Sequence, residues 1–179
     1  KAVNHMLAEL GTIIHADRLY ILETDGIKVS NTFEWCREGV TPEIQTLQDL
    51  DYDDYIGGWE KFLVDNTSLV LEDIEVLRED DPVDYANLKR QGIKSIMDSP
   101  IYDGGSLIGY IGADNYEISD AVNTQKVLET ISYFLGARMV NQKLLKRLDY
   151  LSHRDMLTGA RNRNGFMEKL EELEKLDHP

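Results

Sequence analysis

The sequence predicts an α+β domain, in which helices pack on the faces of a central antiparallel β-sheet and a long helix follows at the C-terminal end. Two pairs of β-prone runs are each joined by a short turn rich in Asp and Gly, which is typical of β-hairpins. Helical periodicity precedes the first pair and follows the second. Hairpins with helices at both ends favour a sheet whose helices are segregated to its faces.

Composition sets the size and class of the protein. With 179 residues and 42% apolar side chains, the chain can form one medium-sized domain with a helical extension. Its formal charge of −14 repels phosphates, so we expect no nucleic-acid partner. No apolar run approaches the roughly 20 residues that span a bilayer. The single cysteine, Cys36, fits a reducing compartment, so we expect a cytoplasmic protein. The start Lys1-Ala2-Val3, without Met or a signal peptide, indicates a piece of a longer protein.

The first helix is expected over about residues 2–15. Its apolar face repeats at intervals of three and four and consists of Val3, Met6, Leu7, Leu10 and Ile14. The first hairpin follows, with β-prone runs at 18–23 and 28–35 on either side of Thr24-Asp25-Gly26.

Residues 43–84 form an acidic stretch in which fourteen Asp and Glu stand against two basic residues. Few apolar positions are periodic, so we expect loops, with a short helix around Trp59, Phe62 and Leu63 and a short strand over 68–71. Asp81-Pro82 is typical of an N-cap followed by proline at the first helical position, and Gly92 is typical of a helix end. A helix of about ten residues is expected between them.

The second hairpin and the long helix complete the domain. β-prone runs at 93–102 and 107–114 flank Asp103-Gly104-Gly105-Ser106, and a helical pattern then runs from Asn123 to about Leu151. One of its stripes can pack on the domain: Leu128, Ile131 and Leu135. A second stripe has the 3,4 rhythm of a coiled-coil seam and consists of Val127, Thr130, Phe134, Ala137, Asn141, Leu144, Leu148 and Leu151.

No metal site is predicted. The four histidines contain no pair at the i, i+4 spacing of a helical metal site. Asp51, Asp53 and Asp54 alternate as in a calcium loop, but positions six and twelve of such a loop would hold Ile56 and Phe62 instead of Gly and Glu. A solvated acidic loop is therefore favoured.

These elements in this order resemble the GAF family of small-molecule sensor domains over about residues 1–140. The resemblance rests on Gly92-Ile93-Lys94-Ser95, Pro100-Ile101-Tyr102, Gly104-Gly105, Leu107-Ile108-Gly109 and Ile111-Gly112. Glu34-Trp35-Cys36 and the later strand pair look like the subgroup found ahead of bacterial signalling enzymes.

The resemblance implies a ligand pocket between one face of the sheet and the variable middle segment. The residues expected to line it are Trp35, Tyr52, Tyr55, Trp59, Asp98 and Ser99. Asp98 interrupts a β-prone run, where a carboxylate is unfavourable unless it is paired or hydrated, so it either faces solvent or contacts a polar ligand together with Ser99. The aromatic residues fit a plain core equally well. Cys36 is either a redox site or chromophore attachment point, or a small buried apolar residue, which is the usual role of an isolated cysteine.

A second resemblance begins after the long helix. Asp155-Met156-Leu157-Thr158-Gly159, Asn162-Arg163 and Phe166 resemble the opening of a GGDEF diguanylate cyclase domain. In that family the Asp-x-Leu-Thr turn separates the signalling helix from the first cyclase helix, whose apolar face would be Phe166, Leu170 and Leu173 here. The catalytic signature lies further downstream, so residues 1–179 are expected to hold no catalytic residue, and Mg and GTP are implied only for the missing cyclase domain.

We therefore interpret residues 1–140 as a GAF-like sensor domain, 141–154 as a coiled-coil signalling stem and 155–179 as the start of a GGDEF domain. An unidentified small molecule in the sensor would bias the encounter of two cyclase domains that condense two GTP into cyclic di-GMP. The alternatives are a ligand-free dimerisation scaffold, or a regulator of a degenerate GGDEF or phosphodiesterase output. A homodimer is expected to form through the long helix. The residues expected to form the dimer or transmit the signal are Asn141, Leu144, Leu148, Leu151, Asp155, Leu157, Thr158, Asn162 and Arg163.

Overall fold

The computed structural model describes residues 2–62, 68–154 and 158–176. The chain divides into two compact units, Lys1–Gly136 and Ala137–Pro179, which are described separately below.

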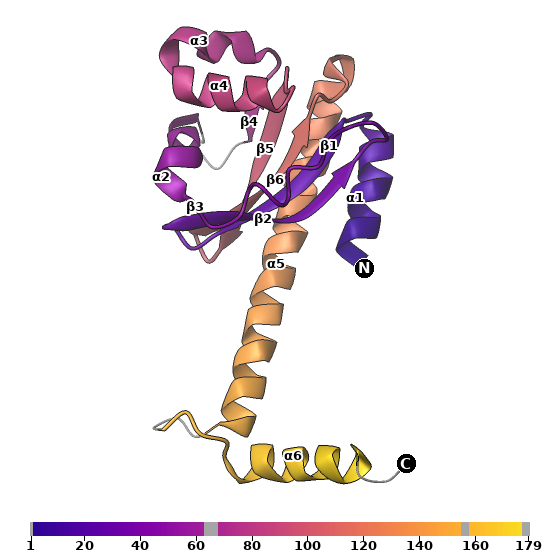
Figure 1. The fold of residues 1–179 in the computed structure, drawn as a ribbon. Coiled ribbons are helices and arrows are strands. Elements are labelled where there is room, and N and C mark those ends of the chain that lie inside the picture. The colour runs from indigo at the N-terminus through magenta and orange to yellow at the C-terminus, as the bar shows by residue number, and fades with distance from the viewer. Residues whose placement is uncertain (1, 63–67, 155–157, 177–179) are drawn as a thin grey trace. The chain divides into compact units, whose positions relative to one another are not determined.

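The first unit is built on an antiparallel sheet with the strand order β3-β2-β1-β6-β5-β4 among the described residues (Figure 1). The strands are β1 (Arg18–Thr24), β2 (Lys28–Cys36), β3 (Leu50–Asp51), β4 (Leu69–Leu71), β5 (Ile96–Asp103) and β6 (Ser106–Asp114). The helices are α1 (Ala2–Ile13), α2 (Tyr52–Tyr55), α3 (Leu77–Asp80), α4 (Pro82–Arg90) and α5 (Ala121–His153), with short 3₁₀ turns η1 (Gly57–Phe62), η3 (Ile74–Val76) and η4 (Ile118–Asp120). Only the first part of α5 belongs to this unit. The predicted α+β class is confirmed.

Both predicted hairpins are confirmed, and their turn residues explain why the strands reverse there. The Asp25 carboxylate accepts hydrogen bonds from the N–H groups of Ile27 and Lys28 at 2.9 and 2.8 Å. Gly104 and Gly105 of the second turn have φ of +54° and +94°, which glycine adopts without strain.

The helix predicted after Asp81 is also confirmed as α4. The Asp81 carboxylate accepts from the Asp84 N–H at 3.1 Å, Pro82 is the first helical residue, and Gly92 has φ of +75° just beyond the end. The short helix expected around Trp59 is η1, and the expected strand at 68–71 is β4, whereas Leu63 lies outside the described residues.

The two faces of the sheet are covered by different elements (Figure 1). The helix face packs against α1 and the first part of α5. Its buried strand residues are Leu19, Ile21, Met97, Ile101, Ile111 and Ala113. Leu128 and Leu135 of α5 are buried, as predicted for the stripe that packs on the domain.

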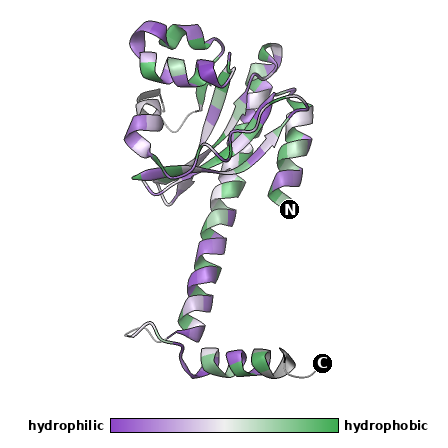
Figure 2. Ribbon diagram, viewed as in Figure 1, coloured by the Kyte–Doolittle hydropathy of each residue, from purple (hydrophilic) through white to green (hydrophobic). Residues whose placement is uncertain are grey.

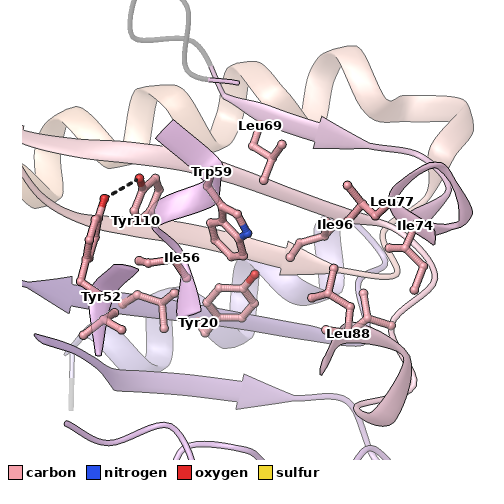
Figure 3. Packing of buried hydrophobic residues seen from close by; sticks show 13 residues of the cluster. Tyr20, Tyr52, Ile56, Trp59, Leu69, Ile74, Leu77, Leu88, Ile96 and Tyr110 are labelled. Carbon is pink, nitrogen blue, oxygen red and sulfur yellow. Dashed lines mark hydrogen bonds between the residues drawn. The ribbon is translucent and has the colours of Figure 1, made fainter. Parts of the chain in front are cut away.

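The cavity face is covered by α2, η1 and α4 and carries a second apolar cluster. Figure 3 shows Tyr20, Ile56, Trp59 and Tyr110 gathered on this face, with Leu88 and Ile96 further along it. The predicted acidic loops are therefore a cover over one side of the sheet, with their apolar side chains turned inward.

The second unit contains the C-terminal part of α5 and the helix α6 (Arg163–Leu176). Hydrophilic and hydrophobic residues alternate along both segments (Figure 2). No helix among the described residues is long and apolar enough to cross a membrane.

Candidate functional site

A cavity lies on the cavity face of the sheet, between the strands and the α2–α4 cover. Its interior volume is about 30 Å³, which is far below the roughly 300–1,000 Å³ typical of pockets for larger ligands, so it suits only a small molecule. Its lining residues are Arg18, Tyr20, Leu22, Asn31, Glu34, Leu47, Tyr55, Trp59, Asp84, Asn87, Leu88, Gln91, Ile93, Ile96 and Asp114.

Strand alternation brings the polar lining residues together. Arg18 and Tyr20 lie two residues apart on β1 and so share one face, and Arg18 is the cross-strand partner of Asp114 on β6. On β2 the register shifts opposite Ile21 and Leu22, where Thr32 is an extra residue. This bulge lets Asn31 and Glu34, which are three residues apart, both reach the cavity.

Arg18 is the centre of a buried ion cluster at the base of the cavity. Its guanidinium lies 3.1 Å from Asp114 Oδ2 and 3.6 Å from Glu34 Oε1. It also donates to Gln91 Oε1 at 3.2 Å and to the Thr41 carbonyl at 3.0 Å. Burial opposes the charged form of Arg18, but the two carboxylates outweigh this effect and raise its pKa. Arg18 is therefore a fixed cation already engaged by protein groups.

Asp114 is held between burial and this cation. Burial raises the pKa of Asp114 to about 7, although Arg18 and the Tyr20 hydroxyl act in the opposite direction. Its proton occupancy therefore changes near neutral pH, and the charge of the cavity lining changes with it.

Asp98 is completely buried on β5, on the same face as the cavity. Its Oδ2 accepts from the Tyr20 hydroxyl at 3.1 Å, and it fits beside the strand partner Gly112, where a Cβ would lie only 2.2 Å from Asp98 Oδ1. Burial and the nearby Asp114 raise the pKa of Asp98 well above its ordinary value. Asp98 thus supports Tyr20 from behind the lining and does not line the cavity itself.

Several buried polar atoms in this region have no hydrogen-bond partner. Three belong to residues that line the cavity, namely Arg18 Nε, Asn31 Oδ1 and Asp114 Oδ1, and the fourth is Asp98 Oδ1. Each such group is expected to cost about 1–3 kcal/mol when buried without a partner. Asn31 and Asp114 are only 1% and 2% exposed, so their partner is either an ordered water or a small ligand inside the cavity.

Aromatic side chains cover the polar base. Trp59 contacts Tyr110 edge to face at a centroid distance of 5.7 Å, and its indole N–H donates to Asp84 Oδ2 at 2.9 Å. Tyr55 accepts a hydrogen bond from Gln91 at 3.2 Å. The Tyr52 and Tyr110 hydroxyls lie 3.4 Å apart in the adjoining core (Figure 3). The cavity therefore combines an apolar cover with a charged base.

Among the predicted pocket residues, Tyr55 and Trp59 line the cavity and Tyr52 packs beside it. Trp35 lies on the opposite face, where its ring occupies the space next to Gly11 of α1. The β2 bulge is the reason, because it reverses the alternation between Asn31 and Trp35. Ser99 also faces the helices and lies 2.6 Å from the Ser68 hydroxyl, so it cannot contact a ligand together with Asp98.

Sequence reasoning missed the charged base of the cavity. Arg18, Glu34 and Asp114 lie in or at the end of β-prone runs, and a charged residue there is the same signal that singled out Asp98. Applying that signal to all strands would have found them.

Cys36 is half-buried at the end of β2. Burial and the neighbouring Glu34 raise the pKa of its thiol to about 11, although Arg18 acts in the opposite direction. The residue is therefore protonated near neutral pH and a weak nucleophile.

The stem residues lie on α5 beyond the first unit. Asn141, Leu144 and Leu148 are exposed, with Leu144 at 56% and Leu148 at 63%, and Leu151 is half-buried. Asp155 and Leu157 lie outside the described residues.

The turn between α5 and α6 is organised by Asn162. Its Nδ2 donates to the Ser152 carbonyl at 2.8 Å, and its Oδ1 accepts from the Gly165 N–H at 3.0 Å as a helix cap. A Cβ at Gly165 would lie 2.4 Å from the His153 carbonyl oxygen, so only glycine allows this close approach. Thr158 accepts from the Ala160 N–H at 3.3 Å, whereas Arg163 is exposed at the start of α6.

The described residues contain no group of three or more His, Cys, Asp or Glu side chains that could hold a metal ion.

Comparison with known proteins identifies the fold family. One similar solved structure is GAF3 of Slr1393 from Synechocystis sp. PCC6803 in its photoproduct state. The two sequences are 21% identical, the match covers 80% of this chain and 94% of that chain, and the TM-score is 0.63. Another is a domain of a putative two-component sensor histidine kinase from Sinorhizobium meliloti 1021, which is 14% identical. The match covers 82% of this chain and 95% of that chain, with a TM-score of 0.57. A third is the chromophore-binding domain of the bacteriophytochrome RpBphP3 from R. palustris, which is 15% identical. The match covers 78% of this chain and 54% of that chain, with a TM-score of 0.63. No curated protein matches the chain. The family model of the GAF domain matches residues 1–139, which is most of the chain, so the chain belongs to the GAF domain family.

Proposed function

We propose that the first unit is a small-molecule sensor whose ligand binds in the cavity between the sheet and the α2–α4 cover. The observation that carries this proposal is the set of unpartnered atoms of Arg18, Asn31 and Asp114 at the cavity's base. A folded domain keeps few such groups, and their concentration beside one cavity indicates a binding site.

Strand β5 carries residues on the cavity face and also contacts α5 on the helix face. Asp98 and Ser99 are neighbours on β5, and they point to opposite faces of the sheet. Ser99 contacts Ser68, whose hydroxyl donates to Glu129 of α5 at 3.1 Å. Nearby, Gly136 of α5 packs against the Tyr102 carbonyl of β5, where a Cβ would lie 2.7 Å from the oxygen. We propose that ligand binding shifts β5 and thereby α5, which biases the stem between two arrangements.

The output we propose is a diguanylate cyclase that follows the stem in the parent protein. This finer proposal rests on the resemblance of residues 155–166 to the opening of a GGDEF domain and on the exposed seam of α5. Parallel pairing of two stems through Asn141, Leu144, Leu148 and Leu151 would hold two such domains together. The Asn at one seam position would fix the register of the pair.

Some of the similar structures carry bilins, such as the phycoerythrobilin-bound and phycocyanobilin-bound GAF domains of a cyanobacterial phytochrome. In this chain the cysteine is not among the cavity-lining residues, and its thiol has a raised pKa. Together with the cavity's interior volume of about 30 Å³, these features favour a smaller ligand that binds without a covalent bond.

The test is to extend the chain to its native end and incubate the purified protein with GTP and Mg²⁺. Cyclic di-GMP as product supports the cyclase output. A folded dimer that forms no product contradicts it and favours a degenerate GGDEF domain or a scaffold. If the extended protein instead degrades cyclic di-GMP, the output is a phosphodiesterase.

A further inference from the structure

The unpartnered atoms at the cavity are mostly acceptors. Asn31 Oδ1 and the ionised form of Asp114 Oδ1 are acceptors that line the cavity without a hydrogen-bond partner. The single unpartnered donor among the lining residues, Arg18 Nε, has Glu34 Oε1 at 3.6 Å. A ligand that satisfies this lining must supply hydrogen-bond donors.

The charge of the lining points in the same direction. Among the lining residues, the carboxylates Glu34 and Asp84 outnumber the single cation Arg18, and Asp114 adds a further negative charge when it is ionised. The Arg18 guanidinium is already engaged by Asp114, Gln91 and the Thr41 carbonyl, so it is poorly placed to neutralise an anionic ligand. An anion would therefore enter a site whose net charge repels it, whereas a cation would be attracted.

The aromatic side chains that cover the cavity also favour a cationic ligand with an apolar part. Trp59, Tyr55 and Tyr20 line the cavity, and aromatic side chains of this kind attract cations and pack against apolar groups. Leu22, Leu88 and Ile96 supply the remaining apolar surface. The cavity therefore suits a molecule with a charged head and a short apolar body.

We propose that this cavity binds a small organic amine in its cationic form, whose N–H groups donate to Asn31 and Asp114 and whose apolar part lies against Trp59. The proposal rests on the proposed sensor function and specifies the chemical class of its ligand.

The experiment is a ¹H–¹⁵N NMR titration of residues 1–179 with isobutylamine, isobutanol and isovalerate, which share a branched apolar body and differ in charge. The chain has two tryptophans, and only Trp59 lines the cavity, whereas Trp35 lies across the sheet against Gly11. The Trp59 indole resonance is expected to shift saturably with isobutylamine, at a Kd at least tenfold below those of the other two probes. The Trp35 resonance serves as the internal control and is expected to stay unchanged.

Asp→Asn variants test whether the preference for isobutylamine depends on the negative charge of the lining, because they remove a charge and keep the size of the side chain. Asp114→Asn and Asp84→Asn each remove a lining carboxylate and are expected to reduce the preference for isobutylamine over isobutanol at least threefold. Asp51→Asn removes a carboxylate from β3 outside the lining and is expected to leave the preference unchanged. Asp84 lies on the covering helix α4, so its variant decides the test if Asp114→Asn does not fold.

If isobutanol or isovalerate binds as tightly as isobutylamine or more tightly, the proposal of a cationic amine ligand is wrong, but the cavity remains a ligand site. If none of the three probes shifts the Trp59 resonance, both the amine and the sensor role of this cavity are wrong.

Discussion

The two faces of the sheet are built from the same strands and both bury apolar side chains, but they differ in the polar groups that they bury. On the helix face, Leu19, Ile111 and Ala113 are fully buried against other apolar groups. On the cavity face, the neighbouring positions hold Arg18 and Asp114, with polar atoms that lack partners. Burying apolar groups stabilises the fold, whereas burying unpartnered polar groups opposes it. Both faces therefore stabilise the fold through apolar burial, but the cavity face gives up part of this stability to the unpartnered polar groups beside its cavity.

The largest effect is expected from the helix face. Ile111→Ala removes buried methyl groups and leaves a cavity, so the free energy of unfolding should decrease by about 2–5 kcal/mol in urea denaturation. Tyr20→Phe on the cavity face keeps the ring and removes one hydrogen bond, so it serves as the comparison and should cost about 1–2 kcal/mol. If Tyr20→Phe is the more damaging change, the division of roles between the faces is wrong.

The second effect is a pH dependence that arises on the cavity face. The pKa of Asp114 is about 7 in the folded chain against an ordinary value of 3.8, so its contribution to stability is present at low pH and is lost as pH rises through 7. Between pH 5 and 8 the free energy of unfolding should decrease by roughly 2–3 kcal/mol from this group. Asp98, whose pKa is also raised, acts in the same direction.

The control for this prediction is Asp114→Asn, which cannot titrate at this position. Denaturation of both proteins at several pH values should give a flatter profile for the variant. A wild-type profile that is flat, or that rises over this range, would show that Asp114 is ionised throughout in the folded chain.

The sequence predicted which helices and strands form better than it predicted which side chains lie on each face of the sheet. The hairpins and α4 follow from local signals, namely Asp25-Gly26, Gly104-Gly105 and Asp81-Pro82, whose effects reach only a few residues. Short elements such as β3 and α2 were not predicted, because they depend on packing against the sheet.

The candidate site was predicted only in part, and the reason is the bulge in β2. Tyr55 and Trp59 were found because the resemblance to GAF sensors places the pocket against the middle segment, where they are aromatic residues. Regular alternation would place Trp35 on the same face as Asn31, but the extra residue Thr32 sends Trp35 to the helix face and brings Glu34 to the cavity. A single inserted residue therefore decides which side chains meet the ligand, and no composition or periodicity shows it.

A smaller effect is expected where the two faces are connected. Ser99→Ala removes a buried hydroxyl that lies 2.6 Å from the Ser68 hydroxyl, and should cost about 1 kcal/mol of stability. If β5 transmits ligand binding to α5, the same variant should also weaken the response of the extended protein's activity to ligand, with its ligand affinity unchanged. The matched control Ser106→Ala changes an exposed serine at the start of β6 and should alter neither quantity. If the activity of the Ser99→Ala variant still responds fully to ligand, the contact between Ser99 and Ser68 does not transmit ligand binding to α5.

The smallest effect on folding is expected at the stem, where most of the apolar seam side chains are exposed. Leu144 is 56% exposed, so Leu144→Asp should change the free energy of unfolding of the dilute chain by no more than about 0.5 kcal/mol. Its effect should appear in association instead, because a buried Asp on a coiled-coil seam opposes pairing. Sedimentation should show a dimer for the wild-type chain and a monomer for Leu144→Asp, whereas Leu145→Asp, exposed but outside the predicted seam, should remain dimeric. A dimer that persists in Leu144→Asp would mean that the exposed leucines of α5 serve a partner other than a second copy of this chain.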